Sequence, residues 1–293
     1  MIYKLIDEEK ARYSIAFLCR TLEVTRSAWY EWRRAGQSQR AREDQRLKVH
    51  VRAAHRGSRG TYGSPRIRKQ LSNEGVQVGR RRVARLMREE GLAGTPKKRF
   101  RNTTDSTHKQ PIAANLLARD FLPAQPNEAW VTDITYISTS SGFLYLVVFI
   151  DLFSKKVVGW SARTHMRADL CLDALKQAIV FRNPKPGLII HSDRGCQYAS
   201  HGFAGFLEQC GFKQSMSRKG NCWDNAPAES FFGTLKTELI NRKSWPSPAA
   251  AKDAIGEYIH SFYNHKRLHS ANGYQSPVDY EHNQQKEKAY MAA

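Results

Sequence analysis

The sequence predicts a chain in two parts: an all-helical, helix-turn-helix-like front region, and an α/β region in which helices flank a mixed sheet. The first observation is charge. The 293 residues carry a formal net charge of +20, and residues 1–100 alone hold 25 Lys and Arg against 10 Asp and Glu. The second is a change near residue 124, from helical spacing of apolar residues to short apolar runs that alternate with helical segments.

The front region contains two predicted pairs of short helices. In residues 14–34, Ser14 can cap one helix, and Thr25 or Ser27 can cap a second one after a tight turn. This arrangement is typical of a helix-turn-helix.

The second pair spans residues 64–75 and 80–91, and its helices end at Gly75 and Gly91. Arginine is concentrated on the second helix of this pair. The residues concerned are Arg80, Arg81, Arg82 and Arg85. Because the excess positive charge lies on these helices, we favour contact with DNA over an ordinary helical hairpin with a solvated surface.

The α/β region is predicted to contain three strands, a helix, a strand, a helix, a strand and a helix. Their ranges are 129–138, 142–154, 155–162, 167–181, 187–193, 201–211, 212–217 and 219–239, and the last range runs from a Gly/Asn loop into the helix. Three consecutive strands followed by strand–helix units predict a mixed sheet with helices on its faces.

These patterns divide the chain into five segments. They are a first helix-turn-helix-like region (1–58), a second one (59–94), a basic linker with phosphate affinity (95–123), the α/β domain (124–243) and a C-terminal helix with a basic tail (244–293). In the tail, Lys266 and Arg267 belong to a basic turn that we expect to contact DNA.

Three carboxylates of the α/β region are candidates for one site. Asp133 lies inside the first strand, Asp193 follows a short buried strand, and Glu229 is in the first turn of the last helix. Taken singly, such residues are usually turn formers or helix-end charges. Strand ends of α/β sheets border the crevice that binds ligands, so neighbouring strands would bring the two aspartates together and the helix could add the glutamate.

Three carboxylates in one site repel one another unless a divalent cation neutralises them. Mg²⁺ prefers oxygen ligands, and a pair of such ions supports in-line displacement at a phosphodiester. The pattern therefore predicts that Asp133, Asp193 and Glu229 bind two Mg²⁺ ions, with Mn²⁺ as a substitute, and act on the DNA backbone.

Other polar residues near these positions have simpler interpretations. Asp151 follows an apolar strand and is expected to shape the turn at its end. Asp224 and Asn225 are expected to cap the last helix, and His191 to be a hydrogen-bonded core histidine rather than a ligand.

The residues around the carboxylates carry a family resemblance. The stretches "WVTDITYI", "HSDRGCQY" and "KGNCWDNAPAESFFGTLKTEL" surround them, and thirty-five residues separate Asp193 from Glu229. This pattern resembles the transposases of bacterial insertion sequences with a retroviral-integrase-like (DDE) core, specifically the second-reading-frame (OrfB) type. The similarity continues through "GTYGSPRIRKQL" and "YIHSFYNHKRLHSANGYQSP", so it covers nearly the whole chain.

The resemblance implies an RNase H-like catalytic core that cleaves DNA at the ends of an insertion element and transfers the strand to target DNA. It implies that Lys236, two helical turns after Glu229, lies near DNA, with only Gly233 between them on that face. It also implies the terminal inverted repeats and target DNA as partners, a homo-oligomer on DNA, and fusion to an upstream-frame helix-turn-helix protein.

Two other function classes stay open. A catalytically silent DNA-binding regulator, or a decayed transposase, would bind DNA in a salt-dependent way and gain nothing from Mg²⁺. A nuclease of the same fold would hydrolyse DNA without joining 3′-OH ends to a new strand.

The cysteines and apolar runs bear on location. Five scattered cysteines without a C-x-x-C pair favour neither a disulfide framework nor a zinc site, and they fit a reducing compartment. No stretch resembles a signal peptide or reaches about 18 apolar residues. We therefore expect a bacterial cytoplasmic protein, associated with the nucleoid and without a membrane partner.

Overall fold

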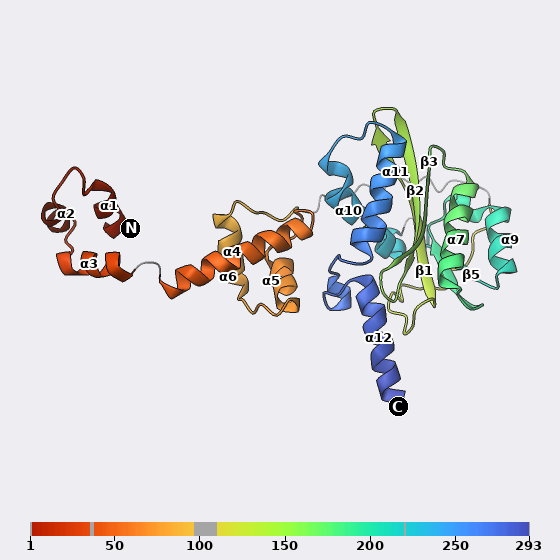
Figure 1. The fold of residues 1–293 in the computed structure, drawn as a ribbon. Coiled ribbons are helices and arrows are strands. Elements are labelled where there is room, and N and C mark those ends of the chain that lie inside the picture. The colour runs from red at the N-terminus through yellow and green to blue at the C-terminus, as the bar shows by residue number, and fades with distance from the viewer. Residues whose placement is uncertain (1, 36–37, 97–109, 220, 293) are drawn as a thin grey trace.

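The computed structural model describes residues 2–35, 38–96, 110–219 and 221–292. Two groups of helices precede a five-stranded α/β domain (Figure 1). Most of the predicted basic linker, residues 97–109, lies outside the described residues. None of the helices in the described ranges combines the length and apolar character that a membrane span requires.

The first helical group consists of α1 (Ile2–Glu9), α2 (Ile15–Thr21) and α3 (Arg26–Ala35). Ser14 caps α2 and Thr25 caps α3, each by accepting a hydrogen bond from a backbone amide in the first turn. The group has a small core of its own, made of Ile6, Leu18, Cys19 and Trp29.

The second helical group consists of α4 (Gln39–Gly57), α5 (Ser64–Asn73) and α6 (Arg80–Glu89). α4 packs against both α5 and α6, and its buried residues Val51 and Ala54 belong to their core. The predicted division at residue 58 is therefore misplaced, because it separates α4 from the helices it packs against. α4 is rich in charged residues and buries few side chains, so its sequence pattern does not reveal its partners.

The sheet contains β1 (Ala129–Thr139), β2 (Gly142–Asp151), β3 (Val157–Arg163), β4 (Ile189–Ser192) and β5 (Lys213–Met216). Its strand order is β3-β2-β1-β4-β5. The first three strands are antiparallel neighbours, and β4 and β5 run parallel to β1. This arrangement confirms the predicted mixed sheet. The first and fourth strands are neighbours, which is the condition under which their aspartates come together.

Helices cover both faces of this sheet (Figure 1). α7 (Ala168–Arg182), α8 (Cys196–Ala199) and α9 (His201–Gln209) lie on one face, and α10 (Ala226–Glu238) and α11 (Pro248–Glu257) lie on the other. Two short 3₁₀ helices flank α10. They are η1 (Cys222–Asn225) and η2 (Ile240–Arg242).

The alternation of side chains along β1 decides which residues face α10. Trp130 and Ile134 belong to the cluster on the α7 side. Val131 and Ile137 belong to the cluster on the α10 side. Because successive strand residues point to opposite faces, Asp133 shares the α10 side with Val131.

The C-terminal segment completes the same domain. α11 continues into the π-helix η3 (Tyr258–Tyr263), followed by η4 (Ser270–Asn272) and α12 (Pro277–Ala292). Ile255 and Tyr258 are fully buried in the cluster that includes β1 and β2. The predicted boundary at residue 244 therefore cuts through one packed unit.

The second helical group also packs onto this domain. The buried Tyr62 accepts a hydrogen bond at its hydroxyl from the backbone amide of Leu268, 2.7 Å away. Arg59 forms an ion pair with Glu257 at 2.8 Å. One continuous buried cluster joins the α4–α6 group to the sheet and its C-terminal helices.

Candidate active site

The sheet places Asp133 and Asp193 at corresponding positions of neighbouring strands. The parallel register of β1 and β4 pairs Val131 with His191. Asp133 lies two residues after Val131, and Asp193 lies two residues after His191. Adjacent strands lie about 4.8 Å apart. Asp193 comes just after β4 ends, and its Oδ1 accepts a hydrogen bond from the backbone amide of Gly195 at 3.0 Å.

Glu229 lies on the helix that covers this face of the sheet. It belongs to the first turn of α10, where the partial positive charge of the helix end favours a carboxylate. The buried Ala228, Phe232 and Leu235 pack in the core shared with β1. These contacts hold the half-buried Glu229 on the side of the sheet that Asp133 faces.

The carboxylates affect one another electrically. The pKa of Asp133 is raised well above its ordinary value by burial, then by the neighbouring charge of Asp193, with a smaller contribution from Glu229. A hydrogen bond from the backbone amide of Ile134, 2.8 Å from Oδ1, and the charge of Lys236 oppose this rise only in part. Burial also raises the pKa of Glu229. The site thus concentrates more negative charge than its surroundings neutralise.

The three carboxylates are not closed into one ligand cage. In the described part of the chain, no three His, Cys, Asp or Glu side chains are close enough to hold a metal ion together. The structure therefore sets Asp133 beside Asp193 and holds Glu229 on the facing helix, within electrostatic range of Asp133.

Lys236 shares the face of α10 that carries Glu229. Its Nζ lies 5.7 Å from the centroid of the Tyr136 ring on β1, a cation–π arrangement. Burial lowers its pKa, and the charge of Asp133 acts in the opposite direction. A Cβ at Gly233 would meet no atom within 4 Å, so this face stays open between Glu229 and Lys236.

Beyond Lys236, the surface is hollowed by a cavity of about 560 Å³. Lys243 and Trp245 line it together with Tyr136 and Lys236, and Nζ of Lys243 lies 4.4 Å from the centroid of the Trp245 ring. Apart from Lys236, the sequence does not reveal this basic and aromatic surface, because its members come from a strand, a helix and a later loop.

Asn225 is another residue whose role the sequence missed. It precedes α10, but its side chain makes no capping hydrogen bond, so the capping prediction is wrong. Its Nδ2 instead donates to the carbonyl oxygen of Thr132, the residue before Asp133, at 3.2 Å. This bond ties the start of α10 to β1 beside the candidate site. In the described structure, its buried Oδ1 has no hydrogen-bond partner.

Asp224 is not a cap either. Its carboxylate is buried and accepts hydrogen bonds from Arg218, Arg119 and Asn115, at distances between 2.8 and 3.0 Å. The bond from Arg218 is the largest cause that holds the pKa of Asp224 far below its usual range. Asp224 therefore anchors the loop before α10.

Two other interpretations are confirmed. Asp151 ends β2 and accepts a hydrogen bond from the backbone amide of Phe153 at 3.0 Å, as expected of a turn-forming residue. His191 is buried, and its ring nitrogens lie 2.8 Å from the hydroxyl of Ser215 and 3.2 Å from that of Ser217. Burial lowers the pKa of His191 to about 4, which fits a neutral core histidine.

The arginines of α6 divide into two kinds. Arg82 and Arg85 form ion pairs with Asp44 of α4, at 2.8 and 2.6 Å, so they bind the two helices together. Arg80 and Arg81 are exposed, and no ion pair is formed by either within the described residues.

Arg267 does not fit the expected DNA contact. Its side chain is buried and forms a two-oxygen ion pair with the buried Glu238 of α10, at 2.8 and 2.9 Å. The prediction for Arg267 is therefore corrected: the guanidinium joins the C-terminal segment to α10. Its neighbour Lys266 is exposed, as a DNA contact requires.

Three family descriptions match the chain. An integrase core domain matches residues 123–222, and a second integrase core domain description matches residues 210–277. An HTH-like domain matches residues 42–100, the range of the α4–α6 group. A chain of the simian T-cell lymphotropic virus intasome has a TM-score of 0.47 and 17% identity, covering 73% of this chain and 70% of its own.

Named relatives match over nearly the full length. Transposase InsF for insertion sequence IS3A of Escherichia coli (strain K12) is 39% identical over 283 residues, which are 96% of this chain and 98% of the relative. The insertion element IS600 uncharacterized 31 kDa protein of Shigella sonnei is 43% identical over 261 residues, or 89% and 96%. The chain belongs to the IS3-type insertion-sequence transposases, and it is a DNA transposase of the DDE type with an integrase core and an HTH-like domain.

Proposed function

We propose that Asp133, Asp193 and Glu229 are the catalytic carboxylates of this transposase and hold two divalent cations, Mg²⁺ or, as a substitute, Mn²⁺. The observation that carries the proposal is the placement of Asp133 on β1 and of Asp193 just after the neighbouring β4, on the side covered by the helix of Glu229, with the pKa of Asp133 raised by burial and then by the charge of Asp193. All donors are hard carboxylate oxygens, which suit such ions. When bound, the cations supply charge neutralisation and polarisation of the reacting phosphodiester.

The protein's own residues position these groups. Asp133 is fixed by the sheet, and Asn225 ties the start of α10 to the same strand. Glu229 completes the ligand set from α10, and Lys236 on the same helix face offers its ammonium group to a DNA phosphate. Water attacks the phosphorus at the element end and the P–O3′ bond breaks, which leaves a 3′-OH. This hydroxyl then attacks the phosphorus of a target phosphodiester: a new P–O3′ bond joins the element end to the target, and the target's own P–O3′ bond breaks and leaves a 3′-OH. No serine or tyrosine nucleophile is therefore needed.

DNA is held by the helical front and by the tail. Arg80 and Arg81 of α6 and Lys266 of the C-terminal turn are exposed, so they can reach phosphates without giving up an internal ion pair. The terminal inverted repeats and the target DNA are the proposed partners. We also propose that the protein acts as a homo-oligomer on DNA, and that an upstream-frame helix-turn-helix protein serves as its fusion partner.

Strand transfer tests this function directly. Labelled, pre-cut element ends are incubated with Mg²⁺ and either the wild type, Glu229→Gln, or Glu208→Gln as a control on the exposed surface of α9. The wild type and the control should join ends to target DNA. Glu229→Gln should lose at least about 100-fold in rate, since metal-assisted charge stabilisation is worth several kcal/mol.

The other function classes give different results in the same assay. A silent regulator would bind DNA and show no joining with Mg²⁺ or Mn²⁺, even when fused to the upstream-frame product. A hydrolytic nuclease would cut the DNA and leave the ends unjoined. Equal rates for Glu229→Gln and the wild type would exclude Glu229 from the chemistry.

A further inference from the structure

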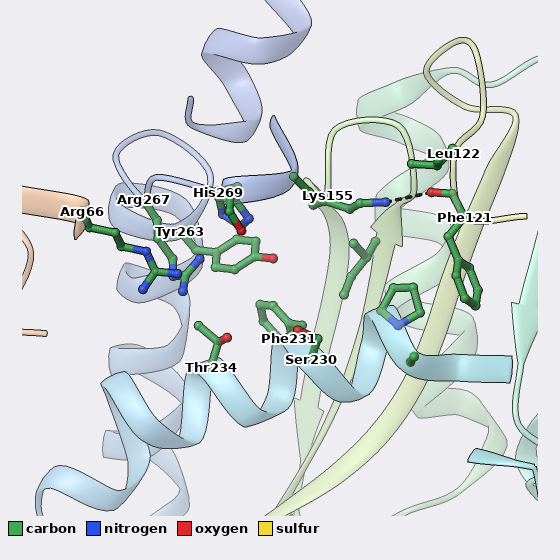
Figure 2. Close-up of a pocket in the computed structure, with 15 residues that line it drawn as sticks. Arg66, Phe121, Leu122, Lys155, Ser230, Phe231, Thr234, Tyr263, Arg267 and His269 are labelled. Atoms are coloured by element: carbon green, nitrogen blue, oxygen red, sulfur yellow. Dashed lines mark hydrogen bonds between the residues drawn. The ribbon is translucent and has the colours of Figure 1, made fainter. Parts of the chain in front are cut away.

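A second cavity lies beside α10, on a different face of this helix from Glu229. It has a volume of about 360 Å³ (Figure 2). Ser230 and Thr234 of α10 line it, so the cavity uses a different face of this helix from Glu229 and Lys236. Its other walls come from α5, the turn between β2 and β3, and the segment after η3. The cavity therefore lies where the second helical group meets the α/β domain.

The wall of this cavity is strongly basic. Arg66, Lys155, Arg267 and His269 line it, and no carboxylate is among its lining residues (Figure 2). Arg267 is neutralised by Glu238. For Arg66 and Lys155, the described residues provide no ion pair.

Arg66 and Lys155 are held in place although no acid pairs with them. The guanidinium of Arg66 lies 5.3 Å from the centroid of the Tyr62 ring. Nζ of Lys155 donates to the backbone carbonyls of Phe121 at 3.0 Å and Leu152 at 2.6 Å, and burial lowers its pKa to about 8. At neutral pH the ammonium stays protonated, with a third N–H beyond those two bonds. The cavity thus has two fixed positive charges that its own wall does not offset.

His269 adds a buried polar atom without a partner. The residue is 8% exposed, and within the described structure its Nε2 makes no hydrogen bond. Buried ring nitrogens are rarely left unpaired, because an unmade hydrogen bond costs about 1–3 kcal/mol. Burial, Arg267 and Arg66 together hold the pKa of His269 well below its usual range. The ring is therefore neutral as long as no anion offsets these charges.

Arg66, the unpaired ring nitrogen of His269 and the hydroxyl of Thr234 line one end of the cavity and can all donate to anionic oxygens, whereas Lys155 adds a positive charge at the opposite end (Figure 2). We propose that this cavity is a binding site for a phosphoryl group. The arginine fork of Arg66 and the ring of His269 pair with the phosphoryl oxygens, the ammonium of Lys155 attracts the anion from across the cavity, and the ring of Phe231 supplies an apolar wall (Figure 2). The group comes from the DNA backbone or from a free phosphate ester, and both present the same oxygens. The site does not depend on the catalytic role of the three carboxylates.

Thermal unfolding of the full chain tests the site with inorganic phosphate as the probe. Phosphate is titrated against sodium chloride at equal ionic strength and pH 7, and the wild type should show a saturable rise in Tm. Arg66→Gln should weaken the apparent phosphate affinity by about tenfold or more, since it loses a charge-assisted bond. Lys155→Gln and Ser270→Glu should also weaken it, because one removes positive charge from the cavity and the other adds negative charge at its rim. Lys252→Gln, on the exposed side of α11, and Glu229→Gln should keep the wild-type response.

Ser270→Glu keeps the test sharp if the buried variants fail to fold, because Ser270 is exposed at the rim and its change removes no buried contact. Ser270→Ala should retain the phosphate-dependent rise in Tm.

A second titration uses a short DNA duplex and measures its Kd by fluorescence anisotropy. Weaker duplex binding in the cavity variants, with competition by phosphate, identifies DNA as the source. Unchanged duplex binding with a lost phosphate response identifies a free phosphate ester. The proposal is overturned if all variants show the same rise in Tm as the wild type. It is also overturned if the wild type shows neither a phosphate-dependent rise in Tm nor competition by phosphate in duplex binding.

Discussion

Asp224 lies in the loop that leads into α10, and its buried carboxylate collects hydrogen bonds from two arginines and an asparagine. The arginines come from different parts of the chain, Arg119 before the sheet and Arg218 after β5. A carboxylate that binds both of them fixes the position from which the helix of Glu229 begins. Its contribution is structural and depends on its ionisation.

Asp224→Asn should lower the free energy of unfolding by about 1–3 kcal/mol, because an amide leaves both guanidinium groups without a charged partner. Arg218 and Arg119 are roughly half exposed, so the expected loss in the free energy of unfolding lies toward the lower end of this range, since solvent screens their charges. The folded-state pKa of Asp224 lies below its unfolded value, so this contribution is complete above about pH 4 and disappears as the pH falls further.

The measurement is Tm at pH 7 and at pH 3 for the wild type and the variant. Asp224→Asn should show the smaller fall in Tm between the two values, since it has no carboxylate to protonate. Asp253→Asn, an exposed position on α11, serves as the control and should follow the wild type. An identical pH response of Asp224→Asn and the wild type would contradict the role of the ion pairs.

At the scale of the elements, α7 lies close against β3 at a glycine. Gly159 of β3 lies under α7, and a Cβ at this position would be 2.7 Å from the Cβ of Ala178 and 2.9 Å from its backbone nitrogen. It would also press against the carbonyl oxygen of Ala174. Because two of these atoms belong to the backbone of α7, the helix itself has to move to make room.

Gly159→Ala should therefore destabilise the protein by about 1–3 kcal/mol, as overpacking does in a well-filled core. Gly202→Ala is the matched control, because a Cβ at Gly202 in α9 meets nothing within 4 Å and alanine favours a helix. The two Tm values should move in opposite directions, or the control should stay unchanged. A neutral Gly159→Ala would show that α7 can shift at little cost.

Local patterns were sufficient for most of these elements. The strands and helices of the α/β domain end within a few residues of their predicted limits, because their periodicity depends on near neighbours. Gly75 and Gly91 follow the predicted helix ends with φ of 83° and 66°, a conformation that favours glycine. The sequence placed Asp133 inside a strand and Asp193 at the end of another, but only the structure shows that these two strands are neighbours.

Long-range packing was not predictable from the sequence. Nothing in α4 shows that it packs with α5 and α6, and the C-terminal helix pattern does not show that it covers the sheet. Positive charge was equally ambiguous: Arg81 and Arg267 look alike in sequence, yet one is exposed and the other is buried against Glu238. The partner of a buried charge lies far away in the chain, so only the folded structure identifies it.

At the scale of the whole molecule, the basic front region should dominate the salt dependence of DNA binding. Each phosphate contact contributes about 0.9 to the slope of log K against log salt concentration. Replacing Arg80 and Arg81 together by glutamine should lower this slope by up to about 2 and weaken binding to all sequences, as measured by fluorescence anisotropy from low to moderate NaCl.

Arg82→Gln provides the contrast. Its guanidinium is engaged by Asp44 and Glu43, so its loss should lower Tm and leave the slope nearly unchanged. If Arg82→Gln changed the slope as much as the double variant, the exposed arginines would not be the principal phosphate contacts of α6.

The core that the α4–α6 group shares with the α/β domain has a geometrical consequence for the insertion element. If α6 contacts the inverted repeat, the buried Tyr62 and its hydrogen bond to Leu268 keep this DNA-binding helix at a fixed distance from the carboxylates. The cleavage site then lies a fixed number of base pairs from the sequence that α6 contacts. Inserting about five base pairs, half a turn of the duplex, would turn the scissile phosphate to the far side. Selection on such elements should therefore preserve spacing as strictly as sequence.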